Sequence, residues 1–493
     1  MKKIKLISIL LFSLTLASLD AQTTVDALRY SQITFGGTAR YMSMAGAFSA
    51  VGGDFSSLST NPAGIGLYKS SEFTITPSVF SNKTTSFYNG YWNEDSKSNF
   101  NISNVGMIMT YDIEKDKPGS DWKNMQFGFG MNRYNNFNSR MIMEGPNMDN
   151  SLLTSYNDLA NGIYYDNLYN SPNNFDLGPA FDTYLLDTLP GEPTQYRNAM
   201  PAGGVWQRKT IQANGSMNEF LFSLGGNYKD KLYIGATFGI PFSRYFEESR
   251  YTENAMTDTI AYDEFSSFNY SENLEARGTG FNFKFGLIYR AHDWIRLGAA
   301  IHTPTFFNMR ENWRTKTESY FDNGDNYYSA SPYGEYEYKL ETPWKAIGSL
   351  AIVVGKIGII SADYEFVDYS NMRFRTHRYY GSFDDYQDVN YDIREYYGKA
   401  HNIRVGTEWR VNNIVLRGGY ALYGSPYKSG FNDGERTSYT GGFGYRDKHY
   451  FIDFAYVYTS SNEDYYFYDK SYVEPVKNEN TSSTFIATLG FRF

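Results

Sequence analysis

The sequence predicts an all-β transmembrane barrel of about fourteen antiparallel strands, with an N-terminal plug inside the lumen. Three observations predict this fold. Apolar and polar residues alternate along many stretches, short turns alternate with long polar connections, and the final stretch alternates up to an aromatic last residue. A barrel strand has one face on lipid and the other on the lumen, so its successive side chains must alternate in character.

Alternation is clearest between positions 281 and 290, where apolar residues recur at every second position. The residues on the apolar side are Phe281, Phe283, Phe285, Leu287 and Tyr289. Positions 220–228 and 403–411 follow the same pattern. Because a soluble β-sandwich produces similar alternation, this observation alone leaves both architectures open.

The lengths of the connections favour the barrel. Five pairs of strands are joined by short polar turns, at Lys229-Asp230, His292-Asp293, Gly355-Lys356, Asn412-Asn413 and residues 446–448. Long polar connections are expected at Lys83–Ser98, Asn138–Gly215, Phe246–Arg277, Asn308–Ser331, Arg373–Tyr397 and Ser461–Thr481. Short turns at one end and long loops at the other are typical of transmembrane barrels.

The composition agrees with a membrane barrel and excludes several other classes of protein. Aromatic residues make up 18% of the chain and charged residues only 20%. No uninterrupted apolar run reaches the ~18 residues that a membrane-spanning helix needs. The absence of Cys excludes disulfides, thiol catalysis and Cys-ligated metals. The net charge of -9 gives no electrostatic reason to expect a nucleic-acid partner.

The N-terminus has the pattern of an export signal. Three lysines precede an apolar core at residues 6–16, and Ala21 stands at the expected cleavage point, so residues 1–21 are predicted to be a signal peptide. We assign residues 22–70 to the plug and residues 71–493 to the barrel. The barrel includes a long insertion at residues 138–215, which we expect on the extracellular side.

The predicted plug centres on residues 35–68, a stretch of small residues with several glycines. It ends in Asn61-Pro62-Ala63-Gly64, a strong turn signal. The stretch shows no strand alternation, and a single helix would not tolerate its glycines. We interpret it as a compact plug whose gate motif is these four residues. The alternative is a glycine-rich linker with an ordinary Asn-Pro turn.

The same stretch carries a family resemblance. The residues that carry it are Ala39, Arg40, Met42 to Met44, Gly46 to Phe48, Ala50, Val51, Asp54, Ser56, Leu58 and Asn61 to Gly64. This pattern resembles the N-terminus of the FadL/OMPP1/TodX family, outer-membrane channels for long-chain fatty acids and other hydrophobic molecules. The resemblance implies a hydrophobic small-molecule ligand, a plug on the periplasmic side, and a multi-pass barrel among the lipids of a Gram-negative outer membrane.

Further segments resemble strand pairs of that family. They are Leu297–Phe307, Ala362–Phe374, Ile403–Tyr427 and Gly441–Tyr458. The chain departs most at Asn138–Gly215, which is longer than the resemblance leads us to expect, so the family's extracellular groove is not carried over. The terminal Phe493 resembles the signal by which the barrel-assembly machinery recognises outer-membrane barrels.

Charged residues on the predicted lumen face are the main candidates for ligand contacts. We select the cations Lys284, Arg296, Arg404, Arg410 and Arg417. One of them would meet a carboxylate head group while an apolar pocket takes the tail. The alternative is a salt-bridged ladder that holds barrel and plug in register. Its acidic members would be Asp363, Glu365, Glu408 and Asp453.

Two glycines on the third predicted strand, Gly128 and Gly130, mark a candidate opening in the wall. Glycine permits a bulge or kink in a strand, and the resemblance implies that ligand leaves sideways near this strand. Sideways exit avoids water, which would cost a released alkyl chain ~0.8 kcal/mol per CH₂. The alternative is that these glycines allow close packing against the plug.

The leading functional hypothesis is passive, plug-gated uptake of hydrophobic small molecules such as long-chain fatty acids. Tyr and His in the long loops motivate a second hypothesis, uptake of haem or another large amphiphile. The long insertion motivates a third, a surface adhesion or structural barrel. Catalytic motifs are absent and the five His are scattered. We therefore expect no enzyme activity, no bound metal and no cofactor.

Overall fold

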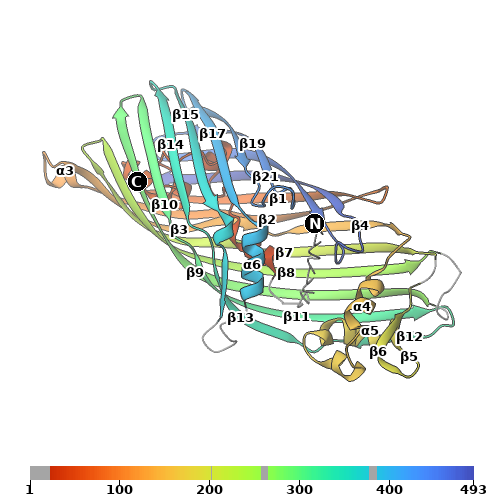
Figure 1. Ribbon diagram of the computed structural model, residues 1–493. Helices are drawn as coiled ribbons and strands as arrows, with labels where there is room; N and C mark the ends of the chain where they lie inside the picture. Colours follow the sequence, from red (N-terminus) through yellow and green to blue (C-terminus); the bar gives the residue numbers. More distant parts are fainter. Residues whose placement is uncertain (1–22, 201–202, 257–264, 377–385) are drawn as a thin grey trace, which may run out of the picture.

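The computed structural model describes residues 23–200, 203–256, 265–376 and 386–493, so the predicted signal peptide lies outside the described residues. One antiparallel sheet closes on itself as a barrel (Figure 1). Closure is direct, because β1 (Glu72–Tyr88) pairs with β2 (Tyr91–Asp112) along one edge and with the last strand, β21 (Val476–Arg492), along the other.

The remaining strands follow around the wall. They are β3 (Trp122–Asn136), β4 (Ser139–Asn147), β7 (Val205–Tyr228), β8 (Leu232–Ala255), β9 (Phe265–His292), β10 (Ile295–His302), β11 (Phe306–Phe321), β12 (Asn326–Ala330), β13 (Gly334–Glu341), β14 (Lys345–Val354), β15 (Gly358–Asp368), β16 (Arg373–Thr376), β17 (Lys399–Val411), β18 (Ile414–Tyr423), β19 (Arg436–Arg446) and β20 (Tyr450–Tyr465). Four wall positions each consist of two consecutive strands, and β12 only extends the edge of β11. The wall therefore has fourteen strand positions, which confirms the predicted fold class.

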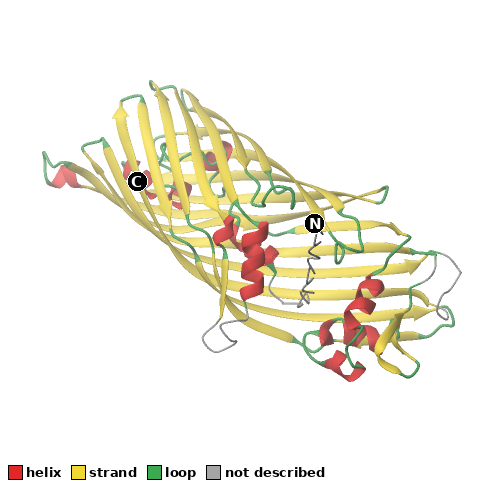
Figure 2. Ribbon diagram, in the orientation of Figure 1, coloured by secondary structure: helices red, strands yellow, loops and turns green. Residues whose placement is uncertain are grey.

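Short helices lie inside the wall and at its ends (Figure 2). The N-terminal ones are α1 (Thr24–Ser31), α2 (Ala39–Ser43), η1 (Phe55–Ser59) and η2 (Pro62–Leu67). The others are α3 (Ile113–Asp116), α4 (Leu152–Ala160), η3 (Tyr165–Tyr169), η4 (Asn173–Phe175), α5 (Leu177–Asp182), η5 (Tyr369–Asn371) and α6 (Gln387–Tyr396). Within the described ranges, no helix is long and apolar enough to cross a membrane.

The two ends of the barrel differ as the sequence predicts. The short turns at residues 229–231, 293–294, 355–357, 412–413 and 447–449 all lie at one end. Figure 1 places α4, α5 and the small hairpin of β5 (Leu186–Leu189) and β6 (Glu192–Asn198) at the opposite end. These elements belong to the predicted insertion. We refer to the two ends of the barrel as the short-turn end and the loop end.

Several predicted loops are in fact strands, and this is the main correction to the sequence analysis. The stretch Lys83–Ser98 forms the tip of a hairpin between β1 and β2 with a two-residue turn at Asn89-Gly90, where φ is 43° and 92°. Strands likewise fill most of Phe246–Arg277 and Asn308–Ser331. The physical reason is that strands beyond the apolar belt have water on their outer face, so both faces are polar and alternation disappears.

The insertion is shorter than its predicted range for the same reason. β4 occupies residues 139–147 and β7 begins at Val205, so both ends of the stretch 138–215 belong to the wall. The part outside the wall is residues 148–204. Its α4, α5 and β5–β6 hairpin pack on one apolar cluster with the tips of the neighbouring strands.

An apolar belt surrounds the outside of the wall. On β9 the outward side chains from Tyr289 to Phe281 are all aromatic or aliphatic and exposed. With a rise of ~3.3 Å per residue and a tilt near 40°, the ten-residue step from Thr279 to Tyr289 gives a belt roughly 25 Å high. Such a belt matches the hydrocarbon thickness that barrel strands cross.

The chain from residue 23 to 70 runs inside this wall. Its lower part, from residue 35 to 68, fills the lumen near the short-turn end and packs on wall residues such as Ala421, Ala455 and Ile486. Helix α1 lies further toward the loop end, where it shares an apolar cluster with α6 and with Met309 and Tyr338 of the wall. The lumen is therefore closed at two levels by the N-terminal segment.

Candidate functional site

The predicted gate motif is fully buried where the plug meets the wall. The amide of Asn61 donates to the carbonyls of Ser49 in the plug and Leu287 in β9, at 2.6 and 3.1 Å. Its side-chain oxygen accepts from the N–H of Ala63 at 3.1 Å, which starts η2 immediately after Pro62. Asn61 therefore orders the turn and joins it to the barrel with one side chain.

Wall glycines make room for this turn. A Cβ at Gly235 would collide with the carbonyl of Pro62, and a Cβ at Gly286 would collide with the side-chain oxygen of Asn61. Both glycines lie on neighbouring strands, β8 and β9, and pair with each other across the ladder. The motif and these two glycines form one fitted contact between plug and wall.

An arginine of helix α2 forms a bidentate contact between the plug and the wall. Arg40 donates through Nε and Nη2 to the two carboxylate oxygens of Glu408 on β17, at 2.7 and 3.0 Å. Its Nη1 also donates to the carbonyl of Gly53 in the plug at 2.8 Å. This bidentate geometry is the strong form of an arginine–carboxylate pair. We call the Arg40–Glu408 pair the plug latch.

The latch continues into a chain of charges on the wall. Glu408 also accepts from Nε of Arg417 at 2.6 Å, and Nη1 of Arg417 donates to Asp453 at 2.8 Å. Asp453 in turn accepts from Arg446 at 2.8 Å. Alternating charges thus run from the plug across β17, β18, β19 and β20 near the short-turn end.

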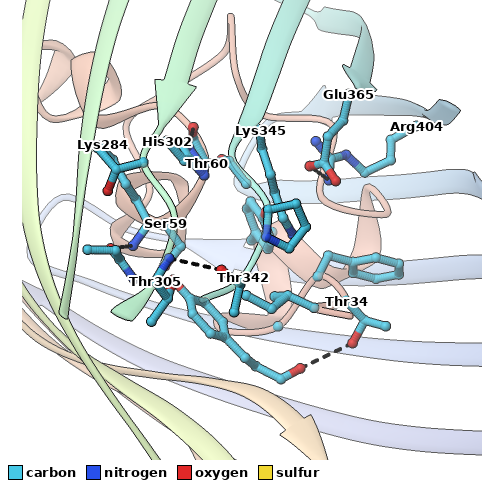
Figure 3. Close-up of a pocket in the computed structure, with 18 residues that line it drawn as sticks. Thr34, Ser59, Thr60, Lys284, His302, Thr305, Thr342, Lys345, Glu365 and Arg404 are labelled. Carbon is cyan, nitrogen blue, oxygen red and sulfur yellow. Dashed lines mark hydrogen bonds and ion pairs between the residues drawn. The ribbon is translucent and has the colours of Figure 1, made fainter. Parts of the chain in front are cut away.

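A small cavity lies against the plug on the side of the loop end. It has a volume of about 50 Å³ and is bordered by Thr34 to Gly36 and Ser59 to Thr60 of the plug. Figure 3 shows the wall residues around it, with Lys284 and His302 on one side and Glu365 and Arg404 on the other. Lys345 projects between these two groups.

Two of these cations have unused hydrogen-bonding capacity. Arg404 donates to Glu365 at 3.2 Å, yet its Nε and Nη2 have no hydrogen-bond partner in the described chain. Lys345 is 8% exposed and makes no hydrogen bond or ion pair with any described residue. Buried donors without partners are costly. The cavity is therefore prepared to receive an anionic or hydrogen-bond-accepting group.

The five predicted contact residues fall into three groups. Lys284 and Arg404 line the cavity, where Lys284 is already paired with Glu219 at 2.6 Å. Arg296 donates to the plug carbonyl of Val51 at 3.1 Å, and Arg417 belongs to the latch network. Arg410 is exposed at the short-turn end, where it donates to the carbonyl of Asn412 at 2.9 Å. Contact of any of them with a ligand stays a prediction.

Sequence reasoning missed two important residues. Arg40 belongs to the plug motif, but nothing local indicates that its partner is a glutamate almost four hundred positions away. Lys345 immediately precedes the predicted strand at residues 346–354. Extending the alternation back by one residue would have placed it on the lumen face with Ile347 and Ala351.

The predicted wall opening at Gly128 and Gly130 lies in a continuous part of the sheet. Gly128 pairs with Ile108, Gly130 pairs with Gly106, and a Cβ on either glycine would collide with β2 or the plug. The β2–β3 ladder ends higher, at the pair Asn104–Asn132. Beyond it, residues 91–103 of β2 pair only with β1, and β3 shifts register after Arg133.

Solved structures share this architecture. A FadL homologue from Pseudomonas aeruginosa superposes with a TM-score of 0.57 at 12% identity, covering 94% of this chain and 99% of that one. The toluene transporter TodX of Pseudomonas putida gives 0.52 at 13% identity, with coverages of 93% and 99%. The toluene transporter TbuX of Ralstonia pickettii has a TM-score of 0.50 at 14% identity, and the match covers 93% of this chain and 99% of that one.

The chain has the FadL fold. This confirms the sequence resemblance at the level of the fold. No protein-family model and no curated protein matches the sequence.

In this FadL fold a second, larger cavity lies above the plug. It has a volume of about 400 Å³ and shares Thr34 and Phe35 with the small cavity. Arg29, Phe80 and Arg436 are among its lining residues. The plug residues 34–35 therefore separate an upper chamber from the small cavity that Lys345 and Arg404 line.

The insertion at the mouth holds a carboxyl group with an unusual environment. Asp176 is 3% exposed and caps α5 by accepting from the N–H of Leu177. Burial raises the pKa of Asp176 from 3.8 to about 7. The folded state therefore favours the protonated carboxyl of Asp176. Protonated Asp176 stabilises the folded state fully below about pH 4, and this contribution is lost as the pH rises through about 7.

Replacing Arg40 with Met should loosen the plug. The change leaves the latch carboxylate half-paired, and loss of one partner of a buried pair costs about 3 kcal/mol. We expect the ion conductance of the reconstituted barrel in planar bilayers to rise and to fluctuate. The control is Lys115→Met, an exposed lysine of α3 at the short-turn end. Equal conductance of the Arg40 and Lys115 variants would contradict the role of the latch.

Replacing Asp176 with Asn should make the insertion insensitive to pH. Asn can still cap α5 but cannot ionise. The wild type should be cleaved faster than the variant by added protease at pH 8, and both should be cleaved at equal rates at pH 5. The exposed Asp149→Asn serves as control. If the ratio of the wild-type cleavage rate to the variant cleavage rate did not change with pH, the raised pKa of Asp176 would be contradicted.

Proposed function

We propose that this protein is a passive outer-membrane channel for hydrophobic small molecules that carry an acidic head group, such as long-chain fatty acids. Two observations beside the plug carry the proposal. Lys345 is buried without an ion pair to any described residue, and two donors of the buried Arg404 have no hydrogen-bond partner there. A carboxylate would satisfy these donors with charge-assisted hydrogen bonds. No catalytic step is part of the proposal.

The location follows from the apolar belt and the N-terminal signal. A barrel with an outward apolar belt roughly 25 Å high fits a bilayer, and the predicted signal peptide supports export. The short-turn end would face the periplasm and the insertion would face the outside. Phe493 would be the residue that the barrel-assembly machinery recognises. Its backbone exchanges two hydrogen bonds with Ser71, and its ring is exposed.

Uptake would begin in the upper chamber and end at the plug. The ligand enters past the insertion and α6, and its chain occupies apolar surface such as Phe35 and Tyr134. Its head group reaches Lys345 only if the segment at residues 33–36 moves, because this segment lies between the two cavities. Ligand binding would thereby displace the plug from its contacts with the wall.

Exit would be sideways, through the wall between β2 and β3. The ladder is missing above Asn104 and Asn132, and the gap is bridged there by side chains, such as the amide of Asn136 donating to Asn99 at 3.0 Å. Side-chain bridges open at lower cost than a strand ladder. In this proposal the opening lies above Gly128 and Gly130, whose close contact with η1 and η2 would keep the plug against β3.

Replacing Lys345 with Met tests the proposed head-group site. We expect fatty-acid uptake by cells that lack their own channel to fall about tenfold, as loss of one charge-assisted hydrogen bond predicts. Uptake of toluene, which has no head group, should stay unchanged. Lys83→Met, at an exposed ion pair with Glu94, is the matched control. Equal loss for both compounds, or no loss for either, would refute the acidic head group.

Linking β2 to β3 across the gap tests the exit route. The chain has no Cys, so Asn99→Cys with Asn136→Cys can be joined by a short reagent that a reductant releases. We expect linking to stop uptake and reduction to restore it. The control pair, Met107→Cys with Phe129→Cys, joins residues that already pair in the ladder. Unchanged uptake in the linked Asn99–Asn136 variant would contradict exit at this place.

A further inference from the structure

Three arginines form a row on the outside of the wall. Arg277 of β9 is the register partner of Arg244 on β8 and of Arg310 on β11, and all three side chains are exposed. Like charges directly opposite each other on neighbouring strands repel. Three in succession are therefore unfavourable unless an anion lies among them. We call these residues the arginine row.

The arginine row lies at the upper edge of the apolar belt. On β9, Arg277 is the first charged outward residue above the aromatic and aliphatic side chains that end at Phe281. On β8, Arg244 is the next outward residue after Phe242. All three arginines lie on the loop-end side of the belt. In a bilayer this level is occupied by lipid head groups of the outward-facing leaflet.

The arginine row borders a hollow in the outer surface. The hollow has a volume of about 520 Å³, and its lining includes the three arginines together with Phe242, Thr279 and Asn308. Charged side chains thus stand next to apolar side chains that continue into the belt. This arrangement suits an amphiphile whose acyl chains lie against the belt and whose charged group lies among the arginines.

Neighbouring carboxylates leave part of the arginine row without a partner. Arg277 pairs with Glu275 and Arg310 pairs with Glu335, while Glu337 also lines the hollow. Arg244 makes no ion pair with any residue of the described chain and lies over the ring of Phe246, 5.2 Å from its centre. The carboxylates therefore neutralise Arg277 and Arg310, whereas Arg244, at the other end of the row, lines the hollow without an ion pair to a described residue.

We propose that the arginine row is a binding site for the phosphate group of an anionic membrane lipid in the outward-facing leaflet. A guanidinium presents paired donors that match phosphate oxygens, and several in a row can hold one phosphate from different sides. This inference rests on the membrane location that is part of the proposed function. It concerns a surface that the transport route does not use.

The test compares lipids that differ only in head group. Native mass spectrometry of the detergent-solubilised protein would measure retention of dioleoyl phosphatidic acid and of dioleoyl phosphatidylcholine. We expect the wild type to retain phosphatidic acid about tenfold more strongly, since each arginine near a membrane surface contributes measurably to anion binding. The variant with Arg244→Gln, Arg277→Gln and Arg310→Gln should retain both lipids equally, and added salt should reduce the wild-type preference.

A matched variant with Arg208→Gln, Arg250→Gln and Arg394→Gln removes the same charge from exposed positions elsewhere and should keep the preference. Loss of the preference in this control, or its survival in the row variant, would overturn the proposal. Displacement of the lipid by millimolar inorganic phosphate would also overturn it and assign a free-phosphate site. Fatty-acid uptake is measured separately, so a failure here leaves the proposed transport standing, and the converse also holds.

Discussion

The structure depends on the contact between an irregular plug and the inner face of the wall. A segment without long helices or strands leaves many backbone groups unpaired, and in a closed lumen these groups need partners from the protein. The wall supplies them through side chains. Thr488 accepts from the N–H of Ala39, Asp363 accepts from the N–H of Ser49, and His302 contacts the carbonyl of Thr60 at 2.8 Å. Without them the plug would expose a polar backbone inside the barrel.

This requirement explains how the charged residues of the lumen are divided. Most of them hold the plug or each other, as the alternative interpretation of a salt-bridged ladder predicts. Arg296 and the latch pair contact the plug directly, and Lys284 is paired with Glu219. Among the described residues, donors of Arg296, Arg404, Arg417 and Arg446 lack hydrogen-bond partners. Of these arginines only Arg404 lines the small cavity, and together with Lys345 it defines the candidate ligand site. A polar lumen is therefore compatible with the proposed apolar cargo, because most of its charges already have a partner within the protein.

The sequence predicts the barrel well, because alternation and turn position depend on local physical rules. It predicts the fourteen strand positions and the short turns, since each outward face in the belt must be apolar. Prediction from the sequence fails above the belt. There the tip of the β1–β2 hairpin is predicted as a loop, although Asn89-Gly90 is itself a strong hairpin signal. Prediction also fails for contacts between distant residues. The partner of Arg40 and the unpaired state of Lys345 depend on how fourteen strands are arranged around the plug, which no local pattern encodes.

The position of α1 constrains the order in which the molecule is built. Residues 24–68 are enclosed by a wall whose final hydrogen-bonded seam, between β1 and β21, forms only when the last strand is in place. The hydroxyl of Tyr397 donates to the carbonyl of Thr24, and Thr488 of that last strand accepts from Ala39. The closing strand therefore binds the N-terminal segment as well as β1, which couples closure of the wall to the ordering of that segment.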